Sequence, residues 1–306
     1  MADLAPQELR VLVAVARAGS FTAAAEQLGS TQSAVSHTVR TVERKLGAVL
    51  FTRGRLGAAP TPAGERAAAH ARRILRLMDT LAIETREAAR GSEEIAGPLR
   101  IAAFRSAATH LLPPVLLRLS KRHPALEPQV VIVRELGRGT AGEVADGRAD
   151  LGIATLDPSA TTLPGVTATP LFREPYALVY PEGATDPKAL PLVDWVENCG
   201  SCTRDWWRAQ DWIPCARLSA EDDVFALSLV AEGLGMSIMP WLSLTDLPPK
   251  VARTDLGALP PTRDVGYVTT PELARTSALR ALIRELRSTP LPAGLLPARP
   301  AVGPHG

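Results

Sequence analysis

The sequence has few cysteines and no long hydrophobic run. Its 306 residues include three cysteines, an odd number that does not make the even set of a disulfide-stabilised framework. No apolar segment reaches the length of about 18 residues that a transmembrane helix needs. Residues 1–4 also lack the basic segment and following apolar run of a secretory signal. We therefore expect a protein of the reducing cytoplasm, without a membrane partner.

Signatures of common enzyme classes are missing as well. The chain contains no GxSxG, P-loop or HExxH motif, which argues against an α/β enzyme carrying an extra binding head. The segment "GRGTAG" matches the glycine spacing of a dinucleotide-binding loop at Gly137, Gly139 and Gly142. It follows the second rather than the first strand expected in its region, so we interpret it as an ordinary strand-to-helix turn. We expect no catalytic residues, no cofactor and no metal.

Positive charge is concentrated at the N-terminus. The net charge is only +2, yet residues 1–90 hold 13 Lys/Arg against 8 Asp/Glu, and the remainder holds 21 against 24. Between residues 30 and 76 the counts are nine basic and two acidic. Such a footprint is typical of a module that binds a polyanion, although basic surfaces are often only solvated. The length and the 46% hydrophobic content allow two or three domains.

Three short helices are expected in the N-terminal basic region. The first ends at Gly19, the second is capped by Ser20 or Thr22 and stops at Gly29, and Thr31 caps the third. Apolar residues recur at helical spacing in all three. These core positions are Leu9, Leu12, Val13, Ala16, Phe21, Ala24, Ala25, Leu28, Val35, Val39, Val42 and Leu46.

Short polar side chains gather at the start of the third helix. We interpret the face opposite its valine stripe as a DNA-reading surface, because side chains and free backbone N–H groups there can reach DNA together. The alternative is a solvated helix start, since serine and threonine favour such positions anyway. The following segment "LFTRGRLGAAPTPAG" predicts two short strands around a turn, a wing that lies along phosphates. The candidate DNA-binding residues are Thr31, Gln32, Ser33, Ser36, His37, Arg40, Arg53 and Arg55.

The run "GSFTAAAEQLGSTQSAVSHTVRTVERKLGAVLFTR", followed by "TPAG", resembles the N-terminal signature of LysR-type transcriptional regulators. The resemblance continues at a lower level to about residue 288. It implies a winged helix-turn-helix in which Ala24, Ala25 and Leu28 are core residues. It also implies that Gln32, Ser33, Ser36 and His37 enter the major groove and that Arg53 belongs to the wing. Two positions depart from the family pattern: Ser33 stands where proline is frequent, and Pro60 where an aliphatic residue is usual.

A long helix is expected directly after the wing. Thr61 caps it and Pro62 occupies its first turn, so residues 62–90 form a linker after a DNA-binding domain of residues 1–61. Its apolar positions alternate by four and three residues, as in a short coiled-coil seam that dimerises; the alternative is packing on its own domain. Residues 91–97 are expected to form a hinge. The seam consists of Ala67, Ala71, Ile74, Met78 and Leu81.

Residues 98–288 alternate predicted strands and helices, which indicates a two-lobed α/β domain with parallel strands. We assign residues 98–165 and 266–288 to lobe 1 and residues 166–265 to lobe 2. Two such lobes joined by crossing strands resemble a periplasmic binding protein, the effector-binding domain of LysR-type regulators. The expected fold class is therefore α+β and multidomain. Residues 289–306, with five prolines and no periodicity, are expected to be a disordered tail.

An effector is expected between the lobes, beyond the carboxyl ends of the strands. Arg105 can bind a carboxylate of an anionic small molecule through two hydrogen bonds; alternatively, it is an exposed arginine paired with a residue such as Glu135. The candidate effector-binding residues are Arg105, Ser106, Thr109, Thr155, Ser201 and Cys202.

Cys199 and Cys202 form a CxxC pair, with Cys215 nearby. No histidine lies close enough in sequence to complete a zinc site. A thiol switch is the alternative trigger, because some relatives of the family sense oxidants through cysteines of the second lobe. Arg204 and Arg208 could stabilise a thiolate there, whereas buried, inert thiols are the simpler interpretation.

The overall expectation is a homodimeric or homotetrameric regulator that binds double-stranded DNA, a small-molecule effector and RNA polymerase.

Overall fold

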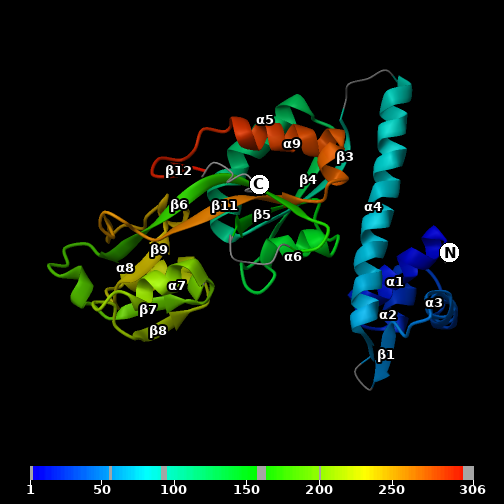
Figure 1. Ribbon diagram of the computed structural model, residues 1–306, viewed down its shortest axis with the longest axis horizontal. Helices are drawn as coiled ribbons and strands as arrows, with labels where there is room; N and C mark the ends of the chain where they lie inside the picture. The colour runs from blue at the N-terminus through cyan, green and yellow to red at the C-terminus, as the bar shows by residue number, and fades with distance from the viewer. Residues whose placement is uncertain (1–2, 55–56, 91–94, 157–162, 200, 299–306) are drawn as a thin grey trace, which may run out of the picture.

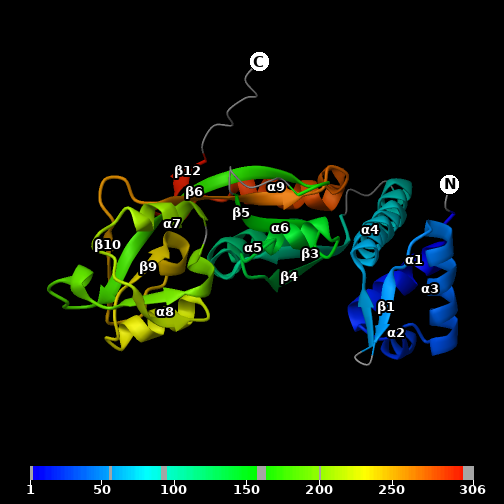
Figure 2. The same cartoon turned by 60° about the horizontal axis from the view of Figure 1, so that its bottom comes forward.

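The computed structural model describes residues 3–54, 57–90, 95–156, 163–199 and 201–298 (Figure 1). A small N-terminal head and a long helix lie at one end of the molecule. A two-lobed α/β body occupies the rest, with lobe 2 farthest from the head (Figures 1 and 2). Among the described helices, none combines the length and the apolarity needed to cross a bilayer.

The head consists of three helices and a hairpin: α1 (Pro6–Ala18), α2 (Phe21–Gln27), α3 (Gln32–Leu46), β1 (Phe51–Gly54) and β2 (Gly57–Pro60). Local sequence sets these boundaries. Ser20 and Thr31 each accept a hydrogen bond from the backbone N–H three residues on, the usual N-cap arrangement. Gly19 and Gly47 end α1 and α3 with φ of 62° and 68°, a backbone conformation that favours glycine. The expected winged helix-turn-helix is therefore present.

The long helix α4 (Pro62–Arg90) begins where Thr61 Oγ1 accepts a hydrogen bond from Gly64 N at 3.0 Å. Gly64 is required there, because a Cβ would overlap the Leu50 carbonyl oxygen. Its first half packs on α1 of the head, where Ala68 and Ala71 are buried.

Lobe 1 is built on parallel strands with helices on both faces. β3 (Gly97–Ala103) lies between β4 (Leu126–Ile132) and β5 (Leu151–Leu156) and is parallel to both. The helices α5 (Leu112–Arg122) and α9 (Ser277–Ser288) cover one face, and α6 (Gly139–Ala145) covers the other. One irregular turn, the π-helix Ala107–Leu111, precedes α5.

A crossing strand joins the two lobes. The first part of β6 (Thr167–Pro181) pairs with β11 (Thr262–Thr269), which also pairs with β5 of lobe 1. Its second part pairs from Tyr176 onward with β9 (Ser237–Pro240) and β10 (Val251–Asp255) of lobe 2. The passage between lobes therefore falls inside β6, near Pro175, and not at residue 166 as expected.

Between residues 192 and 220, lobe 2 contains two strands and an α-helix that the sequence patterns did not indicate. Two parallel strands, β7 (Leu192–Trp195) and β8 (Ala216–Ala220), flank α7 (Ser201–Arg208), and α8 (Asp223–Ala231) follows. Short 3-10 turns cover Pro187–Ala189, Val196–Cys199 and Trp241–Leu244 in this lobe, and a further one, Leu273–Arg275, precedes α9 in lobe 1.

Both ends of the body depart from the sequence prediction. Gly97, expected to be part of the hinge, is the first residue of β3, while residues 91–94 lie outside the described residues. The prediction of a disordered tail is wrong for residues 289–298. Within them β12 (Leu296–Pro297) pairs with β6, and Trp241 Nε1 donates to Ala293 O at 2.7 Å. Residues 299–306 lie outside the described part.

Candidate functional site

The start of α3 presents an exposed polar surface. Gln32, Ser33, His37 and Arg40 are exposed, and Thr31 Oγ1 lies 3.0 Å from Ser33 Oγ. The first turn of α3 contains no acidic residue, so its free N–H groups and helix dipole favour an anion such as a phosphate. This face can combine phosphate contacts with hydrogen bonds to base edges.

Two expectations for α3 are wrong. Ser36 is only 5% exposed, because it lies three residues before Val39 and so borders the buried stripe and not the outer face. Leu46, expected in the core, is exposed at the last turn of the helix. Ser36 therefore does not face outward with Gln32 and His37.

The hairpin β1–β2 is fixed to α3 by one carboxylate. Glu43 Oε1 accepts hydrogen bonds from Leu50 N at 2.8 Å and Phe51 N at 3.3 Å. The Phe51 ring packs edge-on against Phe21, with the ring centroids 6.3 Å apart. Arg53 lies in β1, but its side chain and all of Arg55 fall outside the described residues. Their role in the wing stays a prediction.

The linker helix has two different apolar surfaces. Ala71 is buried and Ala67 is half-buried against the head, so the first part of the expected seam packs within its own domain. Ile74, Met78 and Leu81 are exposed, and Leu81 is 67% exposed. Only the second part of the seam is thus open to a partner.

A buried ion pair joins the linker helix to lobe 1. Arg76 Nε lies 2.8 Å from Asp150 Oδ1, and Arg76 Nη2 lies 3.0 Å from Asp150 Oδ2, with the two residues 7% and 2% exposed. Arg76 Nη2 also donates to Pro98 O, and Asp150 accepts from Arg100 N. Sequence reasoning missed this pair, because no local pattern connects a helical arginine with the residue before a distant strand.

Arg105 joins the two lobes by salt bridges. Its Nη2 lies 2.9 Å from Asp222 Oδ2, and its Nε lies 3.4 Å from Asp223 Oδ1, at the start of α8. The expectation that Arg105 pairs with something like Glu135 is therefore wrong, because its partners come from lobe 2. Asp222 also caps α8 by accepting from Phe225 N, so this contact positions α8 relative to β3.

Glu135 organises the loop after β4 and the end of β5 in lobe 1. Its carboxylate accepts hydrogen bonds from Thr140 N, Thr140 Oγ1 and Thr155 N, at 2.7 to 2.9 Å. This carboxylate occupies the Thr140 N–H of the "GRGTAG" turn, at a helix start where a dinucleotide phosphate would otherwise bind. In lobe 2, burial together with the negative charges of Asp223 and Glu135 raises the pKa of Glu197.

The expected effector-binding residues have different surroundings. Arg105 and Thr109 lie together at the end of β3, and Thr109 Oγ1 donates to Arg105 O. The buried Thr155 Oγ1 has no hydrogen-bond partner among the described residues. Ser106 is buried against the core and does not form part of an open wall, contrary to expectation. The side chains of Ser201 and Cys202 fall outside the described residues.

The cysteine pair is only partly described. Cys199 ends the turn Val196–Cys199 and Cys202 lies in α7, but neither side chain belongs to the described residues. Arg204 and Arg208 are salt-bridged to Asp194 at 2.7 Å and Asp205 at 2.9 Å. These carboxylates reduce the positive charge that the two arginines could offer a thiolate.

Comparisons with known proteins match both parts of the chain. Residues 6–65 match the model of the bacterial regulatory helix-turn-helix protein, lysR family, and residues 92–290 match that of the LysR substrate binding domain. A probable HTH-type transcriptional regulator, LrrA of Synechococcus elongatus, is 34% identical over 295 residues, which cover 92% of this chain and 96% of the relative.

Solved structures show the same fold at lower identity. A full-length OxyR variant from Pseudomonas aeruginosa superposes with a TM-score of 0.71 at 23% identity, covering 98% of this chain and 100% of that chain. CbnR in complex with its target DNA superposes with a TM-score of 0.63 at 21% identity, covering 93% and 99%.

Proposed function

Because the chain belongs to the LysR family of transcriptional regulators, we propose that α3 reads operator DNA in the major groove while the β1–β2 wing follows the phosphates. The observation that supports this most strongly is the exposed face of α3, with Gln32, Ser33, His37 and Arg40 at a helix start that contains no acidic residue. Gln and Arg side chains suit base edges, and the remaining donors suit phosphates.

The test is a comparison of operator and scrambled DNA by fluorescence anisotropy at several salt concentrations. A sequence-specific regulator binds the operator much more tightly, and its affinity falls with salt in proportion to the number of phosphate contacts. Equal affinity for both DNAs at every salt concentration would contradict the proposal.

We place the effector between the lobes, against Arg105, Thr109 and Thr155. The Arg105–Asp222 bridge spans the cleft, so a ligand that competes for either partner changes the relative stability of lobe arrangements. The hydroxyl of Thr155 without a partner offers a ligand a hydrogen bond. The expectation of an anionic effector rested on Arg105, which already faces two carboxylates. We therefore propose a small-molecule effector and do not restrict it to anions.

We propose that the exposed part of α4 dimerises two copies of the chain. Replacing Leu81 with glutamate should shift the protein towards monomers, because a charge would enter an apolar helix–helix contact. Sedimentation equilibrium of the full chain measures this shift. The matched control is Leu259→Glu, since Leu259 is 86% exposed and lies far from α4 in sequence. Unchanged assembly in Leu81→Glu would place the interface elsewhere.

The thiol switch stays as a second candidate function, supported by the CxxC spacing of Cys199 and Cys202. If these thiols are the trigger, peroxide should change the operator footprint of the wild type and leave that of Cys199→Ser unchanged. Cys215→Ser is the control, because Cys215 is an exposed free cysteine. Identical wild-type footprints with and without peroxide would leave only the small-molecule proposal.

A further inference from the structure

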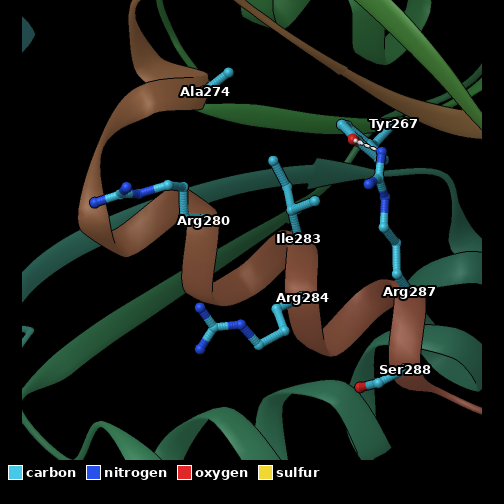
Figure 3. Close-up of a pocket in the computed structure, with 7 residues that line it drawn as sticks. All are labelled: Tyr267, Ala274, Arg280, Ile283, Arg284, Arg287 and Ser288. Carbon is cyan, nitrogen blue, oxygen red and sulfur yellow. Dashed lines mark hydrogen bonds between the residues drawn. The ribbon is translucent and has the colours of Figure 1, made fainter.

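The outer face of α9 contains a hollow that the proposed effector cleft does not use. Its volume is about 620 Å³. The apolar floor is formed by Tyr267 of β11, Ala274 and Ile283, and the rim by Arg280, Arg284 and Arg287 (Figure 3). Neither Arg105 nor Asp222 lines this hollow. The hollow is therefore a site on lobe 1 separate from the proposed effector site.

The rim carries positive charge without matching carboxylates. Arg287 is turned towards Tyr267 and donates from Nη2 to the phenol oxygen at 2.9 Å (Figure 3). Arg280 and Arg284 are exposed, and within the described part of the chain neither forms a salt bridge. Within the described residues, none of the three guanidinium groups that line the hollow forms a salt bridge with a carboxylate.

The opposite side of the same helix shows how this chain neutralises arginines elsewhere. Glu285 of α9 is buried and receives both Arg118 and Arg122 of α5. That carboxylate pairs with the two arginines of α5 and does not line the hollow. Since α9 supplies its one acidic side chain to α5, the charge on its outer face is left for a ligand.

The arrangement indicates the chemistry of that ligand. Guanidinium groups bind carboxylates through paired hydrogen bonds, and an apolar floor favours a flat hydrocarbon body. Arg280 and Arg287 stand two turns apart, about 10 Å along the helix axis, so they can hold two separated negative groups. We propose that this hollow binds a small aromatic dicarboxylate.

Ligand binding there would act close to the linker helix. The first N–H of α9, that of Ser277, donates to Glu84 Oε1 of α4 at 3.1 Å. The hollow and this contact therefore share one helix, and α9 packs directly on the lobe 1 core.

Isothermal titration of the full-length protein with terephthalate tests the proposal. We expect saturable binding of one molecule per chain, at least tenfold weaker in the double variant Arg280→Gln/Arg284→Gln. These residues are exposed, so the variant should fold, and circular dichroism verifies this. Terephthalamide, which has the same shape without charge, and succinate, which lacks the ring, should both bind at least tenfold more weakly.

Two further variants separate the hollow from the effector cleft. Arg105→Gln should leave terephthalate binding unchanged, and so should Arg217→Gln on the exposed strand β8. Absence of saturable binding, or equal affinity in the wild type and the Arg280→Gln/Arg284→Gln variant, would overturn the proposal. Loss of binding in Arg105→Gln alone would assign the ligand to the cleft and would also overturn it, without affecting the proposed regulator function.

Discussion

Replacing Arg76 with alanine should lower the free energy of unfolding by about 3–5 kcal/mol, the usual cost of leaving one partner of a buried ion pair unpaired. Asp150 is 2% exposed, and among the described residues its carboxylate would keep the Arg100 N–H as its one donor. Urea denaturation followed by far-ultraviolet circular dichroism measures the change across the whole chain. Tryptophan fluorescence would not, because all five tryptophans lie between residues 195 and 241 of lobe 2.

A matched control tests whether the loss of stability comes from the burial of the ion pair and not from the loss of a charge alone. Arg208 forms a salt bridge of similar length with Asp205, but both side chains are largely exposed. Such pairs contribute only about 0–1 kcal/mol, so Arg208→Ala should change stability little. The double variant Arg76→Met/Asp150→Leu should recover most of the loss, since an apolar pair leaves no buried charge. If Arg76→Ala is no worse than Arg208→Ala, the contact between linker helix and lobe 1 does not persist in solution.

The head could be predicted from sequence because its determinants are local. Ser20 and Thr31 lie within three residues of the N–H groups that they cap, and Gly19 and Gly47 end helices by their own backbone conformation. The valine stripe of α3 is likewise repeated within a single helix. Ser36 shows the limit of such patterns, because its helix buries a wider strip than the valines alone indicate.

The interfaces between parts could not be predicted in the same way. Arg105 meets Asp222 over a separation of 117 residues, and Arg76 meets Asp150 over 74. Such pairs depend on how β6 crosses between lobes and how α4 lies on lobe 1, which no local periodicity specifies. The strand β12 was missed for the same reason. It forms because β6 offers an edge to pair with, and its own proline-rich sequence does not indicate a strand.

Replacing Gln32 or His37 with alanine should reduce the preference for operator over scrambled DNA by about 1–3 kcal/mol each, the usual value of a side chain that reads a base edge. Both side chains are exposed on the first two turns of α3. The measurement is the ratio of the two dissociation constants at one fixed salt concentration, because phosphate contacts shift both constants together.

Ser36→Ala is the discriminating control, because Ser36 lies beside the same residues in sequence but is buried. It should leave the operator preference unchanged and alter only the stability of the head, by up to about 1–3 kcal/mol if its hydroxyl is satisfied internally. Thermal melting of the variant detects that change independently of DNA. If Ser36→Ala removes the preference while the head stays equally stable, and Gln32→Ala does not, then α3 presents a different face to DNA and the reading surface must be reassigned.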